Sequence, residues 1–179
     1  MLKKPVLEKL NEQIGHEFFS SNLYLQMSAW CADQGLDGCA AFLRVHSQEE
    51  MGHMFRLFDY VIESDEKPLL PALEQPQADY ESVQNLFEEI LEHEKMISAK
   101  IAELVEVAFS EKDFFTFNFL QWYVSEQHEE EALARSNLDK LRLVGTEGRG
   151  IFFFDAELGR MRAGEKIVPS DAGGAGEGE

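Results

Sequence analysis

Proline is missing from two long stretches of the chain, and this absence constrains its fold more than any other feature. The five prolines are Pro5, Pro68, Pro71, Pro76 and Pro169. A proline in a helix interior removes a hydrogen bond and clashes with the preceding turn, so long helices need such gaps. Within the gaps, apolar residues recur three and four positions apart, and no sustained alternation marks a strand. The pattern predicts an all-α protein.

Glycine and proline divide this all-α chain into four long predicted helices and one short one. The long helices are expected at residues 5–34, 38–64, 80–109 and 112–143, and the short fifth helix at 148–159. The first two and the last two long helices have short connections, so each pair should form an antiparallel hairpin. About 15 residues join the hairpins, enough extended chain to run the length of a helix.

The expected architecture is therefore a four-helix bundle with one long crossover between the second and third helices. The bundle and the short fifth helix should form one domain over residues 1–160. Residues 161–179 are rich in glycine and acid, which predicts a flexible tail.

The charge of the chain narrows its function. Asp and Glu number 34 against 16 Lys and Arg, a formal net charge of −18, which disfavours nucleic acid and favours cations. Cys31 and Cys39 are expected to be free thiols of a reducing compartment. No apolar run is long enough for a membrane span, and the start does not resemble a signal peptide. We expect a soluble cytoplasmic protein.

A glutamate interrupts the apolar stripe of each long helix near its middle. The four are Glu17, Glu50, Glu94 and Glu130. Each lies roughly 18–26 Å along its helix at ~1.5 Å per residue, so antiparallel neighbours should bring all four to one level. Burying unpaired carboxylates costs several kcal/mol each, and the nearby basic residues lie off the stripes. Two divalent cations would balance the four charges, so the pattern predicts a metal centre.

The spacing of the ligands supports such a centre. Glu50 and His53 share one helix face, so both can ligate one ion, while Glu50 bridges to a second ion held by Glu94 and Glu130. Gln127 lies three residues before Glu130, where some di-iron bundles have Glu-x-x-His. Oxygen ligands with one nitrogen suit Fe, Mn or Zn.

A second acidic group flanks the first. Glu49, Glu126 and Glu129 could form an outer metal site that shares Glu130, provided that the second and fourth helices are neighbours. A solvated or cavity-facing acidic surface explains these three residues equally well. His46 is expected to be a hydrogen-bonded core residue rather than a ligand.

Five parts of the sequence resemble the non-haem bacterial ferritins. They are Asn11–Glu17, Tyr24 with Gln26–Cys31, Gln48–His53, Glu94, and Asn118–Glu131. The resemblance spans about residues 1–160. It implies a shell of 24 subunits that oxidises Fe(II) with O2 or H2O2 at a di-iron centre and stores ferric mineral inside.

The resemblance also implies a role for each residue of the centre. The first iron site is Glu17, Glu50 and His53; the second is Glu50, Glu94 and Glu130; the third is Glu49, Glu126, Glu129 and Glu130. Tyr24 resembles the tyrosine that contacts the centre, so Tyr24 and Gln127 are the catalytic candidates beside the ligands. Met51 follows Glu50 as a haem-ligating methionine does in bacterioferritins, but the fourth helix lacks Glu-x-x-His, and haem is not expected.

The sequence is also compatible with three other functions. The first is a di-iron peroxidase or oxygenase without storage, which would use the same ligands but need an open substrate pocket. The second is a DNA-protecting miniferritin, which places iron ligands between subunits, whereas one chain here supplies the whole set. The third is a metal-free structural bundle.

Overall fold

The computed structural model describes residues 2–164, and the side chains of residues 2–161. All regular secondary structure in this part of the chain is helical, which confirms the predicted all-α fold. The helices are α1 Lys4–Asp33, α2 Asp37–Glu63, α3 Val83–Ser110, α4 Phe114–Val144 and α5 Arg149–Gly164.

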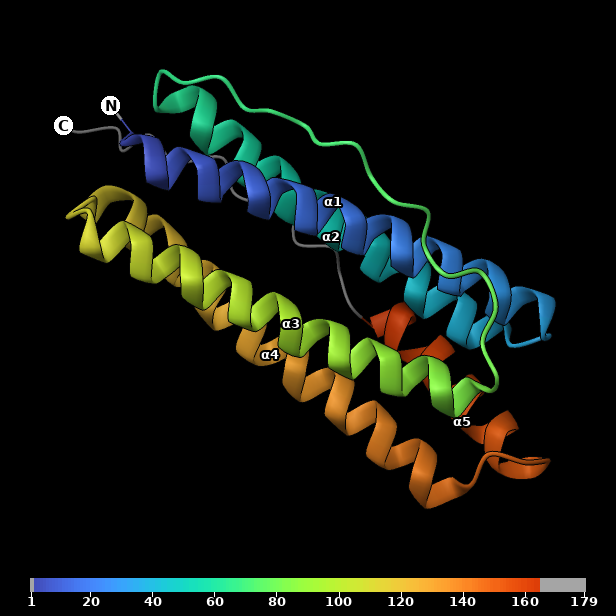
Figure 1. Cartoon of the computed structure of the whole chain (residues 1–179). Helices are drawn as coiled ribbons and strands as arrows, with labels where there is room; N and C mark the ends of the chain where they lie inside the picture. Colours follow the sequence, from blue (N-terminus) through green and yellow to red (C-terminus); the bar gives the residue numbers. More distant parts are fainter. Residues whose placement is uncertain (1, 165–179) are drawn as a thin grey trace, which may run out of the picture.

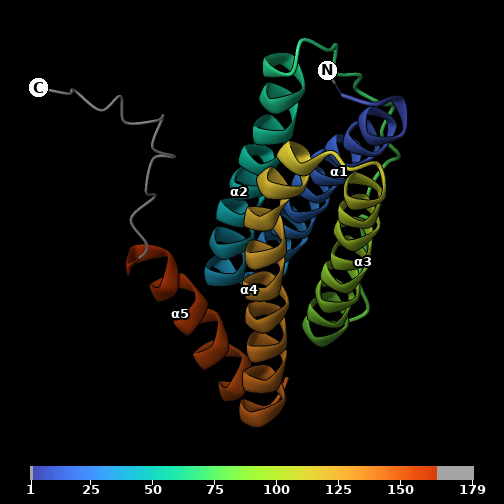
Figure 2. The same ribbon diagram turned by 90° about the vertical axis from the view of Figure 1, so that its left-hand side faces the viewer.

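The four long helices form two hairpins that pack against each other. In Figure 1, α1 lies along α2 and α3 along α4, while the crossover runs back along α1 to the start of α3. The hairpins meet where α1 packs on α3. In contrast, no Cα atom of α2 comes within 8 Å of one in α4. Figure 2 shows α5 slanting across one end of the bundle, against α2 and α4.

The helix ends follow local chemistry, and two of them differ from expectation by three residues or more. The third helix begins at Val83 rather than near residue 80, because the Ser82 hydroxyl accepts a hydrogen bond from the Asn85 amide at 3.1 Å. Tyr80 precedes the helix as a buried anchor whose ring packs edge-on against Trp30 at 5.6 Å. The last helix continues to Gly164, beyond residue 159, and the remaining residues of the predicted tail lie outside the described part of the chain.

The crossover is held close to α1. The Leu69 amide donates to Asn11 Oδ1 at 2.8 Å. At Gly15 a Cβ atom would lie only 2.7 Å from Cγ of Pro71, so a side chain there would push the crossover away. Glycine is therefore needed where the crossover crosses α1.

The docking of α5 depends on a second close approach, at Gly38. The Cys39 amide donates to Asp155 Oδ1 at 2.8 Å, and a Cβ atom on Gly38 would lie 1.9 Å from the Asp155 carbonyl oxygen. We expect Gly38→Ala to displace α5 and lower the free energy of unfolding by about 1–3 kcal/mol. Gly52→Ala is the matched control, because open space surrounds Gly52 in the same helix. It should raise stability by about 0.5–1 kcal/mol. Calorimetric melting of both variants tests this contact, and similar shifts would contradict it.

Two hydrophobic clusters occupy opposite ends of the bundle. One lies at the α5 end and includes Leu43, Phe87 and Phe154. The other lies at the far end and includes Leu10, Leu57 and Leu104. The middle of the bundle separates them, and the polar residues of the stripes lie there.

Candidate metal centre

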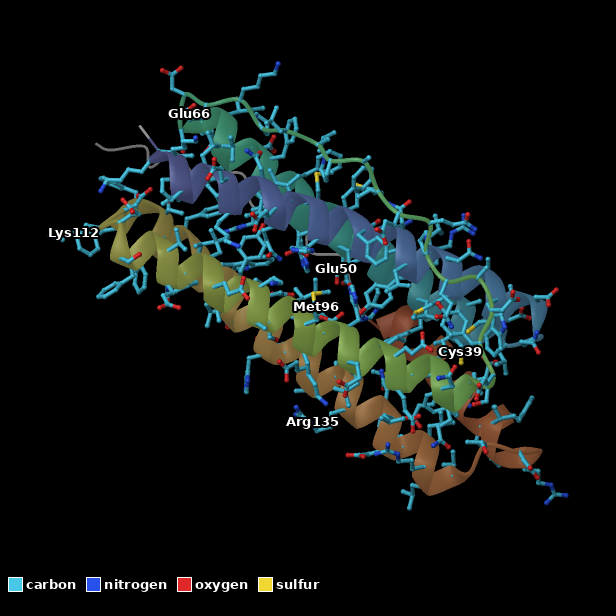
Figure 3. All side chains as sticks on the ribbon, viewed as in Figure 1. Cys39, Glu50, Glu66, Met96, Lys112 and Arg135 are labelled. Carbon is cyan, nitrogen blue, oxygen red and sulfur yellow. The ribbon has the colours of Figure 1, made fainter. Side chains whose placement is uncertain are left out.

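A layer of buried polar side chains crosses the middle of the bundle. Its members are 2–8 % exposed and come from α1, α2, α3 and α4: Gln13, Glu17, His46, Glu50, Glu94 and Gln127. Figure 3 shows Glu50 half-way along the bundle, between the two hairpins. The four antiparallel helices therefore bring glutamates that are far apart in sequence to one level.

One group in this layer contains Glu17, Glu50 and His53. Each offers one ligand atom, and these atoms all lie within 4.8 Å of one another. Glu50 Oε2 is 3.3 Å from His53 Nδ1, as expected for residues three apart on one helix face. Gln13 Nε2, one turn earlier in α1, donates to Glu17 Oε1 at 2.8 Å and orients this carboxylate.

Glu94 belongs to the same buried layer, and two side chains from other helices donate hydrogen bonds to it. The Tyr24 hydroxyl donates to Oε1. The Gln127 amide donates to Oε2 at 2.5 Å and to the backbone oxygen of Glu94 at 3.0 Å. The two candidate catalytic residues of the sequence thus both contact one predicted ligand, and each fixes its orientation.

A second group brings together His46, Glu49 and Glu130, again with one ligand atom each within 4.8 Å. His46 Nε2 is 3.9 Å from Glu130 Oε2, and Nδ1 is 3.7 Å from Glu49 Oε2. His46 also meets its expected role, because it is buried with Nδ1 3.2 Å from the Phe42 carbonyl oxygen. Its place beside two acids was missed, although His46 and Glu49 have the same three-residue spacing as Glu50 and His53.

The group that meets this distance does not include the other two acids of the predicted outer site, Glu126 and Glu129. Glu126 Oε1 is 4.0 Å from His53 Nε2, on the side of the first group. Glu129 is exposed. Their share in an outer site stays a prediction.

The electrostatics of the layer favour a cation. Burial, and then the charge of Glu50, raises the pKa of Glu17 well above 4.5. Burial, and then the charges of Glu94 and Glu130, does the same for Glu50. Burial also raises the pKa of Glu94. No lysine or arginine among residues 2–161 is buried, so the positive charge that would let these carboxyls ionise would come from outside the chain.

The residue types present fit a pair of divalent ions. Glu17, Glu50 and His53 offer two carboxylates and an imidazole, which suits iron, manganese or zinc. Glu94 and Glu130 add carboxylates on the far side of Glu50, and both contribute to raising its pKa. Glu50 therefore lies between the two halves, where a bridging ligand would lie.

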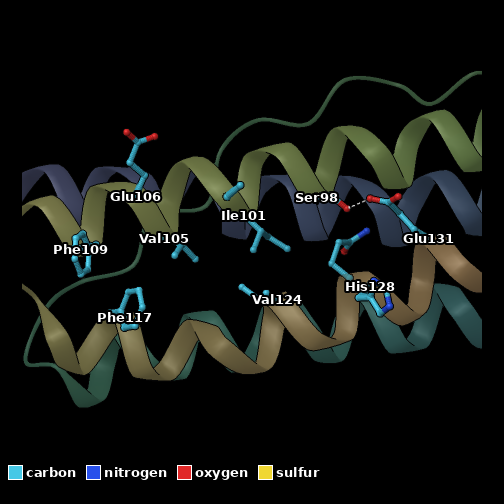
Figure 4. A pocket seen from close by; sticks show the side chains of 11 residues that line it. Ser98, Ile101, Val105, Glu106, Phe109, Phe117, Val124, His128 and Glu131 are labelled. Atoms are coloured by element: carbon cyan, nitrogen blue, oxygen red, sulfur yellow. Dashed lines mark hydrogen bonds between the residues drawn. The ribbon is translucent and has the colours of Figure 1, made fainter.

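A surface groove between α3 and α4 approaches this centre. It has a volume of ≈ 690 Å³ and is lined mainly by apolar residues, among them Ile101, Val105 and Val124 (Figure 4). Its polar end holds Ser98, which donates to Glu131 across the two helices. Gln127 also lines the groove, so its amide separates the groove from Glu94.

None of the helices in the described residues combines the length and apolar character that crossing a membrane requires.

The comparisons with known proteins agree with this architecture. The ferritin family, described as a ferritin-like domain, matches residues 7–144. A bacterial non-heme ferritin of Escherichia coli O6:H1 is 53 % identical over 161 residues, covering 90 % of this chain and 98 % of the relative. One from Campylobacter jejuni is 45 % identical over 93 % of this chain and 99 % of the relative.

The solved structures agree as well. A crystal structure of an open-pore ferritin from Archaeoglobus fulgidus matches with a TM-score of 0.87 and 43 % identity, over 89 % of this chain and 98 % of that one. A Chlorobium tepidum ferritin matches with a TM-score of 0.80 and 47 % identity, over 88 % and 97 %. Shared sequence over nearly the whole length and the same overall fold lead to one conclusion: the chain belongs to the ferritin family.

Proposed function

We propose that this protein stores iron and has ferroxidase activity, oxidising Fe(II) to Fe(III) at a di-iron centre inside each subunit. The observation that carries the proposal is the buried acid layer. Glu17, Glu50 and Glu94 are at most 4 % exposed, have raised pKa values and have His53 beside them. One Fe(II) would bind Glu17, Glu50 and His53, and the other Glu50, Glu94 and Glu130.

The chemistry follows from the ligands. Two Fe(II) ions each give one electron. Dioxygen takes up both electrons and two protons and becomes H2O2, or H2O2 takes up two electrons and two protons and becomes two waters. Hard carboxylate oxygens stabilise Fe(III) more than Fe(II), so they favour the oxidation. Tyr24 and Gln127 act as positioning residues, because their hydrogen bonds hold the Glu94 carboxylate toward the pair.

The storage part of the proposal rests on the similarity to bacterial non-heme ferritins and on the surface of the chain. Bacterial non-heme ferritins match along almost their full length, so a shell of 24 subunits that holds ferric mineral is the proposed assembly. Phe115 is 87 % exposed, Phe152 70 % and Phe153 64 %, and apolar surface of this kind is typical of contacts between copies. The net charge of −18 per chain would attract cations to such a shell.

A third iron site beside the pair belongs to the same proposal. His46, Glu49 and Glu130 support it by their proximity, with Glu126 and Glu129 as further acids on α4. Glu130 would then be shared between the pair and the third ion. Neither haem nor nucleic acid is part of the proposal, and the cytoplasm is the proposed location.

The test is aerobic addition of Fe(II) to the purified protein. Ferric absorbance should rise in a fast phase limited to a few ions per subunit, followed by a slower phase as mineral accumulates. Size-exclusion with light scattering should give a particle of about 490 kDa for 24 copies of the 20.4 kDa chain. Oxidation no faster than in buffer alone would contradict ferroxidase activity, and a single-chain particle would contradict the shell.

The groove favours one second candidate, a di-iron peroxidase or oxygenase acting on a small substrate. An apolar groove of ≈ 690 Å³ that ends at Gln127 beside Glu94 is the kind of access that such an enzyme needs. Particle mass separates the two functions. A monomer or dimer that oxidises Fe(II) without holding mineral would favour the second candidate.

A further inference from the structure

Asn137 presents a buried oxygen that the protein does not satisfy. The residue is 1 % exposed, and among the described residues no hydrogen-bond donor reaches its side-chain oxygen Oδ1. Buried polar atoms normally have a partner, because burial without one removes the hydrogen bonds that water provides. An unpaired oxygen on the buried face of α4 therefore indicates that a hydrogen-bond donor from outside the chain binds there.

A small cavity lies next to Asn137. It has a volume of ≈ 10 Å³, and Asn137 lines it. That volume suits one water-sized molecule, since about one such sphere is the least that a hydrated cavity needs. Water fits this volume as the walls stand, whereas hydrogen peroxide, with one more oxygen atom, would need a small movement of the packed walls, which include Phe42, Phe87 and Ala134.

Four other lining residues belong to the metal centre. Tyr24, His46, Glu94 and Glu130 all line the cavity. Each of them carries an oxygen or nitrogen, so a molecule bound to Asn137 would have further polar partners within the same cavity. Two to four such partners are what a buried water requires. The cavity therefore connects the orphan oxygen with the second half of the proposed iron pair.

The geometry points to a binding site for one small O–H donor, water or hydrogen peroxide, held by Asn137 against the Glu94 and Glu130 side of the centre. The donor gives a hydrogen bond to Asn137 Oδ1. Water and hydrogen peroxide share this chemistry, and both take part in the proposed oxidation. Asn137 acts as a positioning residue, since it holds the small molecule and lies two turns of α4 from Glu130.

Crystal structures test the site without using the ferroxidase activity. The wild-type protein and Asn137→Leu are crystallised without iron and without peroxide. The wild type should show one ordered peak within hydrogen-bond distance of Oδ1, and Asn137→Leu should lack it. Ile90→Val is the control, because it widens the same cavity by one methyl group and keeps Asn137, so its peak should remain. A wild-type structure without the peak, or a peak that survives in Asn137→Leu, would overturn the proposal.

A kinetic experiment, which rests on the proposed function, distinguishes water from hydrogen peroxide as the molecule bound at the site. Fe(II) oxidation is measured with O2 and with H2O2 as oxidant in the wild type, Asn137→Leu and Ile90→Val. If hydrogen peroxide binds at the site, Asn137→Leu should raise the KM for H2O2 roughly five- to tenfold and leave the O2-driven rate unchanged. An unchanged KM together with the crystallographic peak identifies the donor as water. If all three proteins are inactive, the proposed function fails and the crystallographic result still decides the site.

Discussion

Glu50→Ala should slow the fast phase of Fe(II) oxidation by about 100-fold or more, the largest effect expected from any single substitution in this chain. Loss of a partner that only orients a ligand costs about 10–100-fold, and Glu50 is the residue that both iron ions would share. Glu50 is 4 % exposed, and its Oε2 lies 3.3 Å from His53 Nδ1. The charges of Glu94 and Glu130 help to raise its pKa. Stopped-flow absorbance after aerobic mixing with Fe(II) measures the effect.

Glu63→Ala provides the control for this substitution. Glu63 lies in the same helix and is exposed, so its removal changes the charge of α2 by the same amount away from the centre. Its fast phase should match that of the wild type. Equal rates in Glu50→Ala and the wild type would show that oxidation takes place elsewhere.

The second large effect is a loss of metal-free stability as the pH rises. Glu17, Glu50 and Glu94 have a higher pKa folded than their ordinary 4.5, mainly through burial. Below pH 4.5 these three carboxyls are protonated in both the folded and the unfolded protein, so their ionisation does not lower the free energy of unfolding. Above it, the unfolded chain releases protons that the folded protein retains, so unfolding becomes easier with each step in pH. The melting temperature of the metal-free protein should therefore fall from pH 5.5 to pH 8.

A glutamine at position 50 isolates this effect. Glu50→Gln keeps the size of the side chain and removes its ionisation, so its melting temperature should depend less on pH than that of the wild type. Zn(II) should stabilise the two proteins by different amounts. At a free concentration 100 times its Kd for the wild type it should stabilise the wild type by about 2.7 kcal/mol, and Glu50→Gln by much less. If the melting temperatures of both proteins changed equally with pH, and Zn(II) stabilised both equally, a buried carboxylate centre would be contradicted.

The fold could be predicted from the sequence because its main determinants are periodic. Long stretches without proline and the three- and four-residue spacing of apolar side chains are properties of the chain itself. The start of α3 could not be placed in this way. The composition of residues 80–82 is compatible with a helix. However, Tyr80 packs on Trp30 and Ser82 caps the helix, so the first helical residue is Val83.

The candidate site was predictable in part, for a related reason. Glu17, Glu50 and Glu94 break apolar stripes, so their burial follows from the same periodicity as the helices. Which side chains meet across the bundle depends on distances between helices, and a sequence does not contain these. The place of His46 beside Glu130, and the position of Glu126 near His53, depend on how the facing side chains of α2 and α4 meet. The orphan oxygen of Asn137 has the same origin, since no pattern marks which buried amide lacks a donor.

The two hydrophobic clusters have a consequence for turnover. Each stabilises one end of the bundle through contacts among its side chains. Under the proposed function, ions would bind and leave in the middle of a subunit, between two ends that these contacts hold together. Such a bundle would keep its helices packed through many rounds of iron binding and release.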